Sequence, residues 1–391
     1  MVVGLILEAN PYHNGHRYLV EQAKTMFCDS HIIAVTSTSF TMRGEISLLD
    51  KFEKTKILLN EGIDIVLELP ISFTLQSADY FAYNTVITLY NAGVTDILIG
   101  CEDDNANNLV EYYNLINSKN FKVLFKENIK NKLSHKATFE KTLVDLNVNA
   151  DLIELFNKPN MTLAFQYYKV IKDNNLPINL HLIKRTTDYY QKNQSLEKIA
   201  SASYIRELYL KNEDFAQYLP YKPHFTDITA FENNLLNIIN FQMLSNFDPK
   251  MKAKINGNSE GILNYIINNG QFDSSFDHLI NSLKNKRYSL NRIRRLLISY
   301  VLNLKQGYET NKNYLRILGL SNNGTSYLTT LPKDIRKQIF SNPNELKKIN
   351  DDYIQMIFSY ELSSTKLYGI LSNNHNLSLK EYQLPIKKEG I

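Results

Sequence analysis

Four short apolar blocks, separated by longer amphipathic stretches, occupy the first 100 residues and constrain the fold more than any other feature. The blocks are residues 2–7, 31–36, 63–69 and 96–99. Each is rich in Val, Ile and Leu without polar alternation, which is typical of strands covered on both faces. Because the intervening stretches are long enough for crossover helices, the pattern predicts an open parallel α/β sheet.

The rest of the chain predicts a helical insertion and a helical C-terminal part. Residues from about 103 to 175 are rich in Asn and Lys and have helical periodicity, and residues 181–183 indicate one more short strand. Leu219-Pro220 marks a boundary, and few strand signals follow residue 230. We therefore predict an α/β domain at 1–220, carrying the insertion, and a separate, mostly α-helical domain at 221–391.

Composition restricts the function classes. Lys and Arg number 44 and Asp and Glu 40, a formal net charge of +4. Proteins that coat nucleic acid through bulk charge carry a larger excess, so a basic surface here must be local. Two cysteines are too few for a disulfide framework or a cysteine-rich zinc site. Without a basic leader or a membrane-length apolar run, the sequence predicts a soluble cytoplasmic protein that does not bind membranes.

The first apolar block runs into Asn10-Pro11-Tyr12-His13-Asn14-Gly15-His16, followed by an amphipathic helix. A strand that turns through a glycine into a helix presents backbone N–H groups and the positive helix end to an anion such as phosphate. His13 and His16 can point into this anion site and donate hydrogen bonds to oxygens whose negative charge grows during attack at phosphorus. We attribute Gly15 to the room that an adenine or ribose needs.

The two histidines also fit two roles that involve no phosphate. The histidines of an isolated HxGH motif are commonly ordinary loop or helix-cap histidines. This motif, however, falls on the first strand-to-helix turn, where ligands of such sheets bind. A zinc site would need further ligands, and no cysteine or third histidine lies at ligand spacing. The motif therefore predicts a phosphate site and no protein-bound metal.

A second polar cluster, Ser201-Ala202-Ser203-Tyr204-Ile205-Arg206, begins a helix after the last predicted strand of the α/β domain. Two hydroxyls at a helix start and a guanidinium one turn later can clamp a phosphate. By itself the cluster also fits a helix cap. Together with the histidines it predicts the opposite wall of a nucleotide pocket, in which Ser201 and Ser203 bind the nucleotide. His13, His16 and Arg206 are the predicted catalytic groups.

A basic segment lies in the predicted C-terminal domain. Arg292 and Arg295 fall opposite an apolar helical stripe, which predicts that they are free to contact backbone phosphate, while Tyr288 can stack on a base. A solvated helix face accounts for most charge runs, but the contrast with the nearly neutral chain favours an RNA-binding surface. The six basic residues, within twelve positions that hold no Asp or Glu, are Lys284, Lys286, Arg287, Arg292, Arg294 and Arg295.

Ordered blocks along nearly the whole chain carry a family resemblance. They are residues 8–16, 43–45, 76–82, 100–102, 201–206, 260–261, 284–288 and 315–319. In these blocks the chain resembles the bacterial tRNA(Met) cytidine acetate ligases, of the HxGH nucleotidyltransferase superfamily. It departs from them at Ala9, Asp79 and Cys101, where an aromatic residue, Glu and Ser are usual. The resemblance implies a Rossmann-like (HUP-type) nucleotidyltransferase domain followed by a mostly helical tRNA-binding domain.

The resemblance also implies an activity: ATP-dependent formation of N4-acetylcytidine at the wobble position of elongator tRNA(Met). Acetate and ATP would give acetyl-adenylate and pyrophosphate, with Mg²⁺ accompanying ATP, and the cytidine amine would then take the acetyl group. The ATP-binding positions that the resemblance implies are Leu7, Glu8, Ala9, Asn10, Pro11, Tyr12, His13, Asn14, Gly15, His16, Gly100, Asn160 and Arg185.

Two rival functions share part of this pattern. A small-molecule adenylyltransferase of cofactor biosynthesis would use the same histidines and clamp, but would leave the basic segment and the C-terminal helices without a purpose. A non-catalytic tRNA-binding protein would use the basic segment, but would not need an intact HxGH motif.

Overall fold

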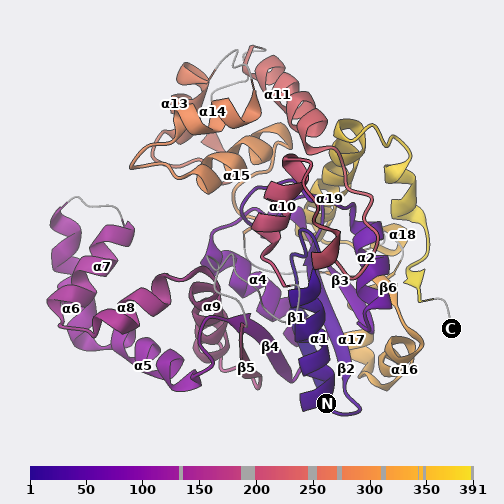
Figure 1. The fold of residues 1–391 in the computed structure, drawn as a ribbon, viewed down its shortest axis with the longest axis horizontal. Helices are drawn as coiled ribbons and strands as arrows, with labels where there is room; N and C mark the ends of the chain where they lie inside the picture. Colours follow the sequence, from indigo (N-terminus) through magenta and orange to yellow (C-terminus); the bar gives the residue numbers. More distant parts are fainter. Residues whose placement is uncertain are drawn as a thin grey trace.

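The computed structural model describes residues 1–131, 135–185, 199–244, 253–270, 275–309, 314–341, 343–346 and 349–388. A mixed, mostly parallel sheet lies at its centre (Figure 1). Within these residues the sheet has eight strands in the order β5-β4-β1-β2-β3-β6-β7, with β8 paired to β6. The strands are β1 (Val2–Ile6), β2 (His31–Ser37), β3 (Ile65–Leu69), β4 (Asp96–Cys101), β5 (Asn179–Lys184), β6 (Leu315–Leu320), β7 (Ile339–Phe340) and β8 (Ile386–Lys387).

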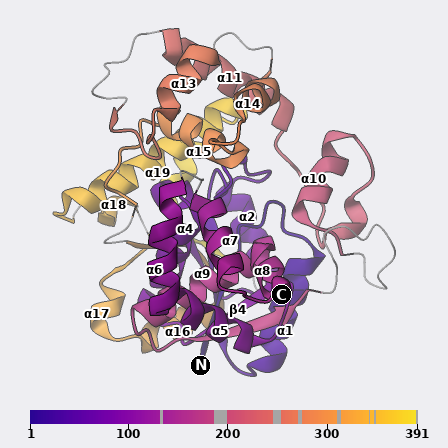
Figure 2. The same cartoon turned by 90° about the vertical axis from the view of Figure 1, so that its left-hand side faces the viewer.

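Helices cover both faces of the sheet and project beyond it (Figures 1 and 2). Those among the first four strands are α1 (Asn14–Met26), α2 (Lys51–Asn60), α3 (Ile71–Thr74) and α4 (Ala78–Asn91). Between β4 and β5 lie α5 (Ala106–Asn117), α6 (Lys119–Asn128), η1 (Ile129–Asn131), α7 (His135–Asp145), α8 (Ala150–Asn157) and α9 (Pro159–Asp173). After β5 come α10 (Ala202–Leu210), η2 (Ala216–Tyr218), α11 (Ile228–Leu244), α13 (Ile262–Asn269), α14 (Phe276–Leu283), α15 (Leu290–Val301), α16 (Asn322–Thr330), α17 (Lys333–Arg336), α18 (Pro343–Leu346), α19 (Asp352–Leu371) and η3 (Leu377–Tyr382).

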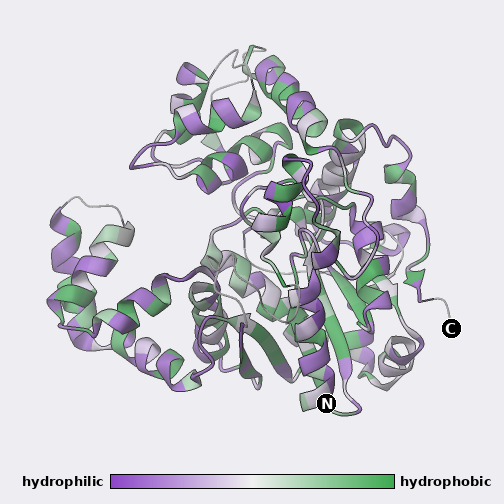
Figure 3. Cartoon of the chain, in the orientation of Figure 1, coloured by the Kyte–Doolittle hydropathy of each residue, from purple (hydrophilic) through white to green (hydrophobic). Residues whose placement is uncertain are grey.

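The five N-terminal strands are parallel, as the apolar blocks predict. Successive residues of β2 face opposite layers: Ile32 and Ala34 pack in the core on the side of α1 and α2, and Ile33 and Val35 in the core on the side of α4 and α9. Both sides of the sheet are therefore dry, which accounts for the lack of polar alternation. In Figure 3 the central strands are mostly apolar, and the helices around them are of mixed hydropathy.

The C-terminal part is not separate from this sheet. β6 pairs antiparallel with β3, so that Leu320 lies opposite Ile65. The predicted parallel α/β sheet is thus extended by an antiparallel strand from residues 221–391, the part that the sequence predicts as a separate domain. The apolar run of β6 resembles the N-terminal blocks, but its partner strand lies far upstream, and no local pattern indicates that pairing.

A buried ion network reinforces the junction. Lys51 Nζ lies 2.8 Å from Glu68, 3.0 Å from Glu361 and 2.6 Å from Glu381, and Arg316 Nη1 lies 3.0 Å from Glu68. None of the five side chains is more than 3% exposed. Charges this far from water are tolerated only when paired, so the network ties α2 and β3 to β6, α19 and η3.

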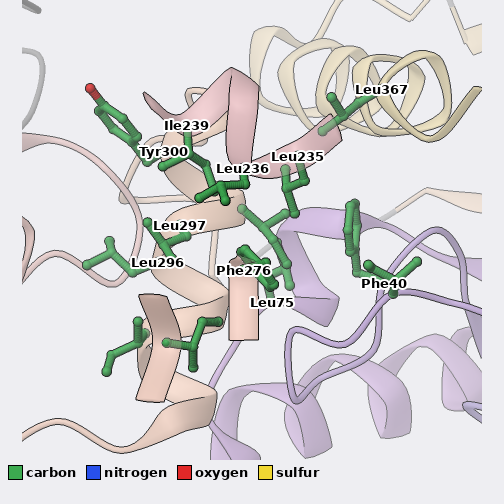
Figure 4. Close-up of a cluster of buried hydrophobic side chains, with 14 of the residues drawn as sticks. Phe40, Leu75, Leu235, Leu236, Ile239, Phe276, Leu296, Leu297, Tyr300 and Leu367 are labelled. Atoms are coloured by element: carbon green, nitrogen blue, oxygen red, sulfur yellow. The ribbon is translucent and has the colours of Figure 1, made fainter. Parts of the chain in front are cut away.

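Two groups of helices project from the sheet (Figures 1 and 2). The arm, α5–α8, is built around an aromatic core in which Tyr112 stacks on Phe156 with ring centroids 3.9 Å apart. The helical lobe, α11 with α13, α14 and α15, shares one core with Phe40, which follows β2, and with Leu75, after α3 (Figure 4). The lobe is therefore packed directly on the N-terminal domain. In the parts of the chain that the structure describes, each helix is too short or too polar to cross a membrane.

Candidate nucleotide-binding site

A cavity of about 220 Å³ lies at the carboxyl ends of β1, β4 and β5, where ligands of parallel α/β sheets bind. The turn after β1, the start of α1 and the first turn of α10 all contribute residues to its lining. The structure thus brings together the two polar motifs that the sequence singles out. The predicted residues in the lining are Leu7, Glu8, Ala9, Asn10, His13, Gly15, His16, Gly100, Asn160, Arg185, Ser203 and Arg206.

Four predicted ATP-binding residues, Pro11, Tyr12, Asn14 and Ser201, are not part of this lining. The buried ring of Tyr12 stacks on His16 with centroids 5.3 Å apart, and Asn14 Nδ2 donates to the Gln217 carbonyl at 3.1 Å. Ser201 Oγ accepts the backbone N–H of the third residue of α10 at 3.2 Å. Ser201 therefore has the helix-cap role that the sequence allows beside phosphate binding.

His13 and His16 form a reciprocal capping box at the start of α1. His13 Nδ1 accepts the Gly15 N–H at 3.0 Å, and His16 Nδ1 accepts the His13 N–H at 3.2 Å. Because each Nδ1 is an acceptor, each neutral ring carries its proton on Nε2. The helix-cap and anion-binding roles are therefore compatible: one nitrogen caps the helix and the other remains a donor at the cavity.

Both rings are neutral near pH 7. Burial lowers the pKa of His13 well below 6.5, and the adjacent His16 and Arg185 lower it further. Burial lowers the pKa of His16 to about 3, with added repulsion from Arg185 and Lys54. The site therefore combines two neutral N–H donors with the fixed positive charge of guanidinium groups.

The two glycines of the site differ in what surrounds them. A Cβ on Gly15 would lie 2.9 Å from Cε1 and 3.0 Å from Nδ1 of His13. The space beside Gly15 is thus filled by the His13 ring rather than reserved for an adenine or ribose, which corrects the sequence prediction. Among the described residues, a Cβ on Gly100 would meet only Arg185 Cγ, at 3.7 Å. The space above Gly100 belongs to the cavity.

Sequence reasoning missed Lys54, which joins two strand ends beneath the site. Lys54, fully buried in α2, donates to the carbonyls of Glu8 at 2.9 Å and Ser37 at 3.0 Å, joining the ends of β1 and β2. Burial lowers the pKa of Lys54 to about 8. Glu8 Oε1 accepts the Met42 N–H at 2.6 Å, and burial raises the pKa of this carboxyl. A single lysine in a helix gives no motif by which this role could be found.

A turn at residues 41–45 closes one side of the cavity, to which Thr41, Met42, Arg43 and Glu45 contribute. Arg206 Nη1 donates to the carbonyl that follows this turn, that of Ile46, at 3.0 Å. Arg206 therefore both lines the cavity and anchors the turn.

A carboxylate at the end of β4 fixes the residue that α9 contributes. Glu102 Oε1 accepts the backbone N–H of Asn160 at 3.2 Å and its Nδ2 at 2.9 Å, and Oε2 accepts the Met161 N–H at 2.7 Å. Glu102 thus caps the positive start of α9 and holds the Asn160 amide at the cavity. The sequence indicates Glu102 only as part of a family block.

The basic segment at 284–295 lies apart from the cavity lining. Lys284, Lys286 and Arg287 are exposed between α14 and α15. Arg292, however, donates to Glu260 at 3.0 Å and to Ser259 at 2.8 Å. Arg294 lies 3.5 Å from Asp277, and Arg295 donates to the Met42 carbonyl at 3.2 Å. The prediction that Arg292 and Arg295 are free was wrong, because their partners come from distant parts of the chain.

Tyr288 is also not a free stacking platform. Its ring is buried, and its hydroxyl donates to the Glu260 carbonyl at 2.8 Å. The guanidinium groups of Arg287 and Arg292 each lie 5.4 Å from its ring centroid.

Among the described residues, no three His, Cys, Asp or Glu side chains are grouped so that they could hold a metal ion.

Known proteins match this chain along almost its full length. The HIGH Nucleotidyl Transferase family model matches residues 1–383. The tRNA(Met) cytidine acetate ligase of Thermosipho africanus is 32% identical over 371 residues, which are 90% of this chain and 88% of the relative. That of Fusobacterium nucleatum is 31% identical over 396 residues, 96% of this chain and 97% of the relative.

Solved structures show the same fold. The apo crystal structure of Thermotoga maritima TmcAL has a TM-score of 0.85 at 24% identity, covering 99% of both chains. A second crystal structure of that protein, bound with alpha-thio ATP, has a TM-score of 0.84 at the same identity and coverage. The full-length matches, together with the capped histidine pair, show that the chain belongs to the HIGH nucleotidyltransferase family and, within it, to the tRNA(Met) cytidine acetate ligases.

Proposed function

We propose that this protein is an ATP-dependent ligase that acetylates N4 of the wobble cytidine of elongator tRNA(Met). The observation that carries the proposal is the cavity where the neutral His13 and His16 rings meet the guanidinium groups of Arg185 and Arg206. This donor set suits the negative charge of a triphosphate under attack. The full-length relatives of the chain are named for this activity.

In the proposed first step, an acetate oxygen attacks the α-phosphorus of ATP and the bond to pyrophosphate breaks. Charge grows on the α-phosphate oxygens and on the leaving pyrophosphate. Nε2–H of His13 and His16 is the donor pair for the first, and Arg185 and Arg206 supply positive charge for the second. Mg²⁺ enters with ATP as part of the substrate, since among the described residues the carboxylates that line the cavity, Glu8 and Glu45, do not make a full ligand set.

In the proposed second step, the cytidine N4 amine attacks the acetyl carbonyl of the adenylate. The bond from this carbonyl to the phosphate oxygen breaks, AMP leaves, and the amine loses a proton. The mixed anhydride is already activated, so the protein's contribution is to hold the amine against the carbonyl. The proposed sites of outer tRNA contact are Lys284, Lys286 and Arg287, whose side chains are exposed on the helical lobe. We infer from this substrate that the protein acts in the cytoplasm.

The test is transfer of label. The protein is incubated with [14C]acetate, ATP and an elongator tRNA(Met) transcript, beside the same transcript with the wobble cytidine changed to uridine. We expect label in the first tRNA only, and only with ATP present. ATP–pyrophosphate exchange driven by a mononucleotide and indifferent to acetate would instead identify a cofactor adenylyltransferase. Retained tRNA binding without exchange for any acid would identify a binding protein.

A further inference from the structure

α15 reaches the wall of the cavity through two successive hydrogen bonds. Arg295 Nη1 donates to the Met42 carbonyl at 3.2 Å, and the Met42 N–H donates to Glu8 Oε1 at 2.6 Å. Glu8 lines the cavity, and Lys54 holds its carbonyl. Met42 therefore links α15 of the lobe to the Glu8 carboxylate of the candidate site.

The turn that contains Met42 also lies directly on the backbone of α15. Gly44 has φ +73°, and a Cβ there would lie 2.8 Å from both Cβ of Arg294 and the backbone nitrogen of Arg295. The Gly44 N–H donates to the Thr41 carbonyl at 2.8 Å, which closes the turn. Phe40, just before the turn, is anchored in the shared core of the lobe (Figure 4). This contact requires glycine at position 44, because any side chain there would collide with α15. The turn and the helix are therefore packed directly against each other.

The surroundings of Arg295 differ from those of a phosphate-contacting arginine. Burial and, to a smaller extent, the nearby Arg292 lower its pKa to about 10, and Asp79 opposes the shift. Arg287, by contrast, is exposed. An arginine that is largely removed from water and donates to a backbone carbonyl holds that backbone in position.

We propose that Arg295 is a positioning residue for adenylate formation, which holds the 41–45 turn and, through Met42, the Glu8 carboxylate in the geometry that binds ATP. This inference rests on the proposed function. The inference gives two arginines of the basic segment different roles. Arg287 is exposed to solvent, whereas Arg295 supports the nucleotide-binding cavity. Loss of the donor would leave the Met42 carbonyl unpaired and let the turn move away from the cavity.

The experiment is acetate-dependent ATP–pyrophosphate exchange in the absence of tRNA. In Arg295→Met, which keeps the unbranched stem of the side chain as far as the position of Nε but has no donor, we expect kcat/KM for ATP to fall about 10- to 100-fold, the loss that follows from removing one charge-assisted hydrogen bond. Most of the change should be a higher KM for ATP. Arg295→Lys should recover part of the activity, since it can still donate to the carbonyl. Arg336→Met, at an exposed arginine of α17, is the matched control and should exchange like the wild type.

A second variant and a second measurement keep the inference independent of folding. Gly44→Ala pushes the turn off α15 without changing Arg295, and should reproduce the rise in KM. The affinity for tRNA should stay at its wild-type value in both Arg295 variants. Wild-type exchange with weakened tRNA binding in Arg295→Met would overturn the inference, and so would an equal loss in the Met and Lys variants that follows a drop in melting temperature.

The failure of the proposed function would look different. In that case the wild type itself shows no acetate-dependent exchange. Binding of labelled ATP by equilibrium dialysis then decides the role of Arg295. Weaker binding in Arg295→Met supports positioning of the site, whereas unchanged binding contradicts it.

Discussion

Replacing Gly15 with alanine should inactivate the site without unfolding the protein. The new Cβ would lie 2.9 Å from Cε1 and 3.0 Å from Nδ1 of His13, closer than carbon and ring atoms approach, so the ring must move. Moving it breaks the 3.0 Å hydrogen bond from the Gly15 N–H, at a net cost of about 1 kcal/mol. Replacing glycine with alanine in a helix stabilises the folded protein by up to about 1 kcal/mol. The two terms nearly cancel, so the melting temperature should change little.

Activity should respond much more strongly than stability. A displaced His13 no longer aims Nε2–H at the cavity, and loss of one preorganised donor costs on the order of 100-fold in rate. The assay is acetate-dependent ATP–pyrophosphate exchange in Gly15→Ala, His13→Ala and the double variant. We expect the double variant to match His13→Ala, because the alanine at 15 acts only through the ring. Full activity in Gly15→Ala, or an additive further loss in the double variant, would refute the reasoning.

Three further outcomes follow from the geometry. Gly100→Ala should raise KM for ATP at an unchanged melting temperature, because its Cβ meets no atom of the described residues closer than 3.7 Å and projects into the cavity; an unchanged KM would contradict this. The folded-state pKa of His16 is lowered to about 3, so its contribution to stability is present above pH 6.5 and lost as pH falls from 6.5 toward 3; melting curves of His16→Asn should show a smaller loss over that window. Lys51→Met leaves three buried carboxylates short of a cation and should destabilise the fold by about 3–5 kcal/mol in urea titrations, whereas Lys56→Met, at an exposed position in the same helix, should be nearly neutral.

Local patterns were sufficient for the parts of the fold that are contiguous in sequence. The strand, turn and helix that present His13 and His16 follow one another without a break, so periodicity and a glycine indicate them together. Because parallel strands end at one edge, the start of α10 could be placed opposite the histidines with no knowledge of tertiary contacts. The family resemblance added Gly100, Asn160 and Arg185, which all line the cavity.

Long-range pairing accounts for what the sequence could not indicate. β6 joins β3 across some 250 residues of chain, so its apolar run carries no mark of its partner. Lys54 donates to backbone carbonyls, and Glu102 accepts from two backbone N–H groups and one side-chain amide, which leaves no pairing of opposite charges to recognise. Arg292 appears unopposed in its own segment, yet Glu260 reaches it from an earlier turn. A charge run predicts a surface only when its distant partners are known.

The central claim is that the cavity beside the capped histidines forms an acyl-adenylate. The most direct measurement is exchange of labelled pyrophosphate into ATP by the purified protein, without tRNA and with or without acetate, for the wild type and His16→Ala. The account predicts acetate-dependent exchange in the wild type and its loss in His16→Ala at an unchanged circular dichroism spectrum. Equal exchange by both proteins, or exchange that does not require acetate, would contradict it.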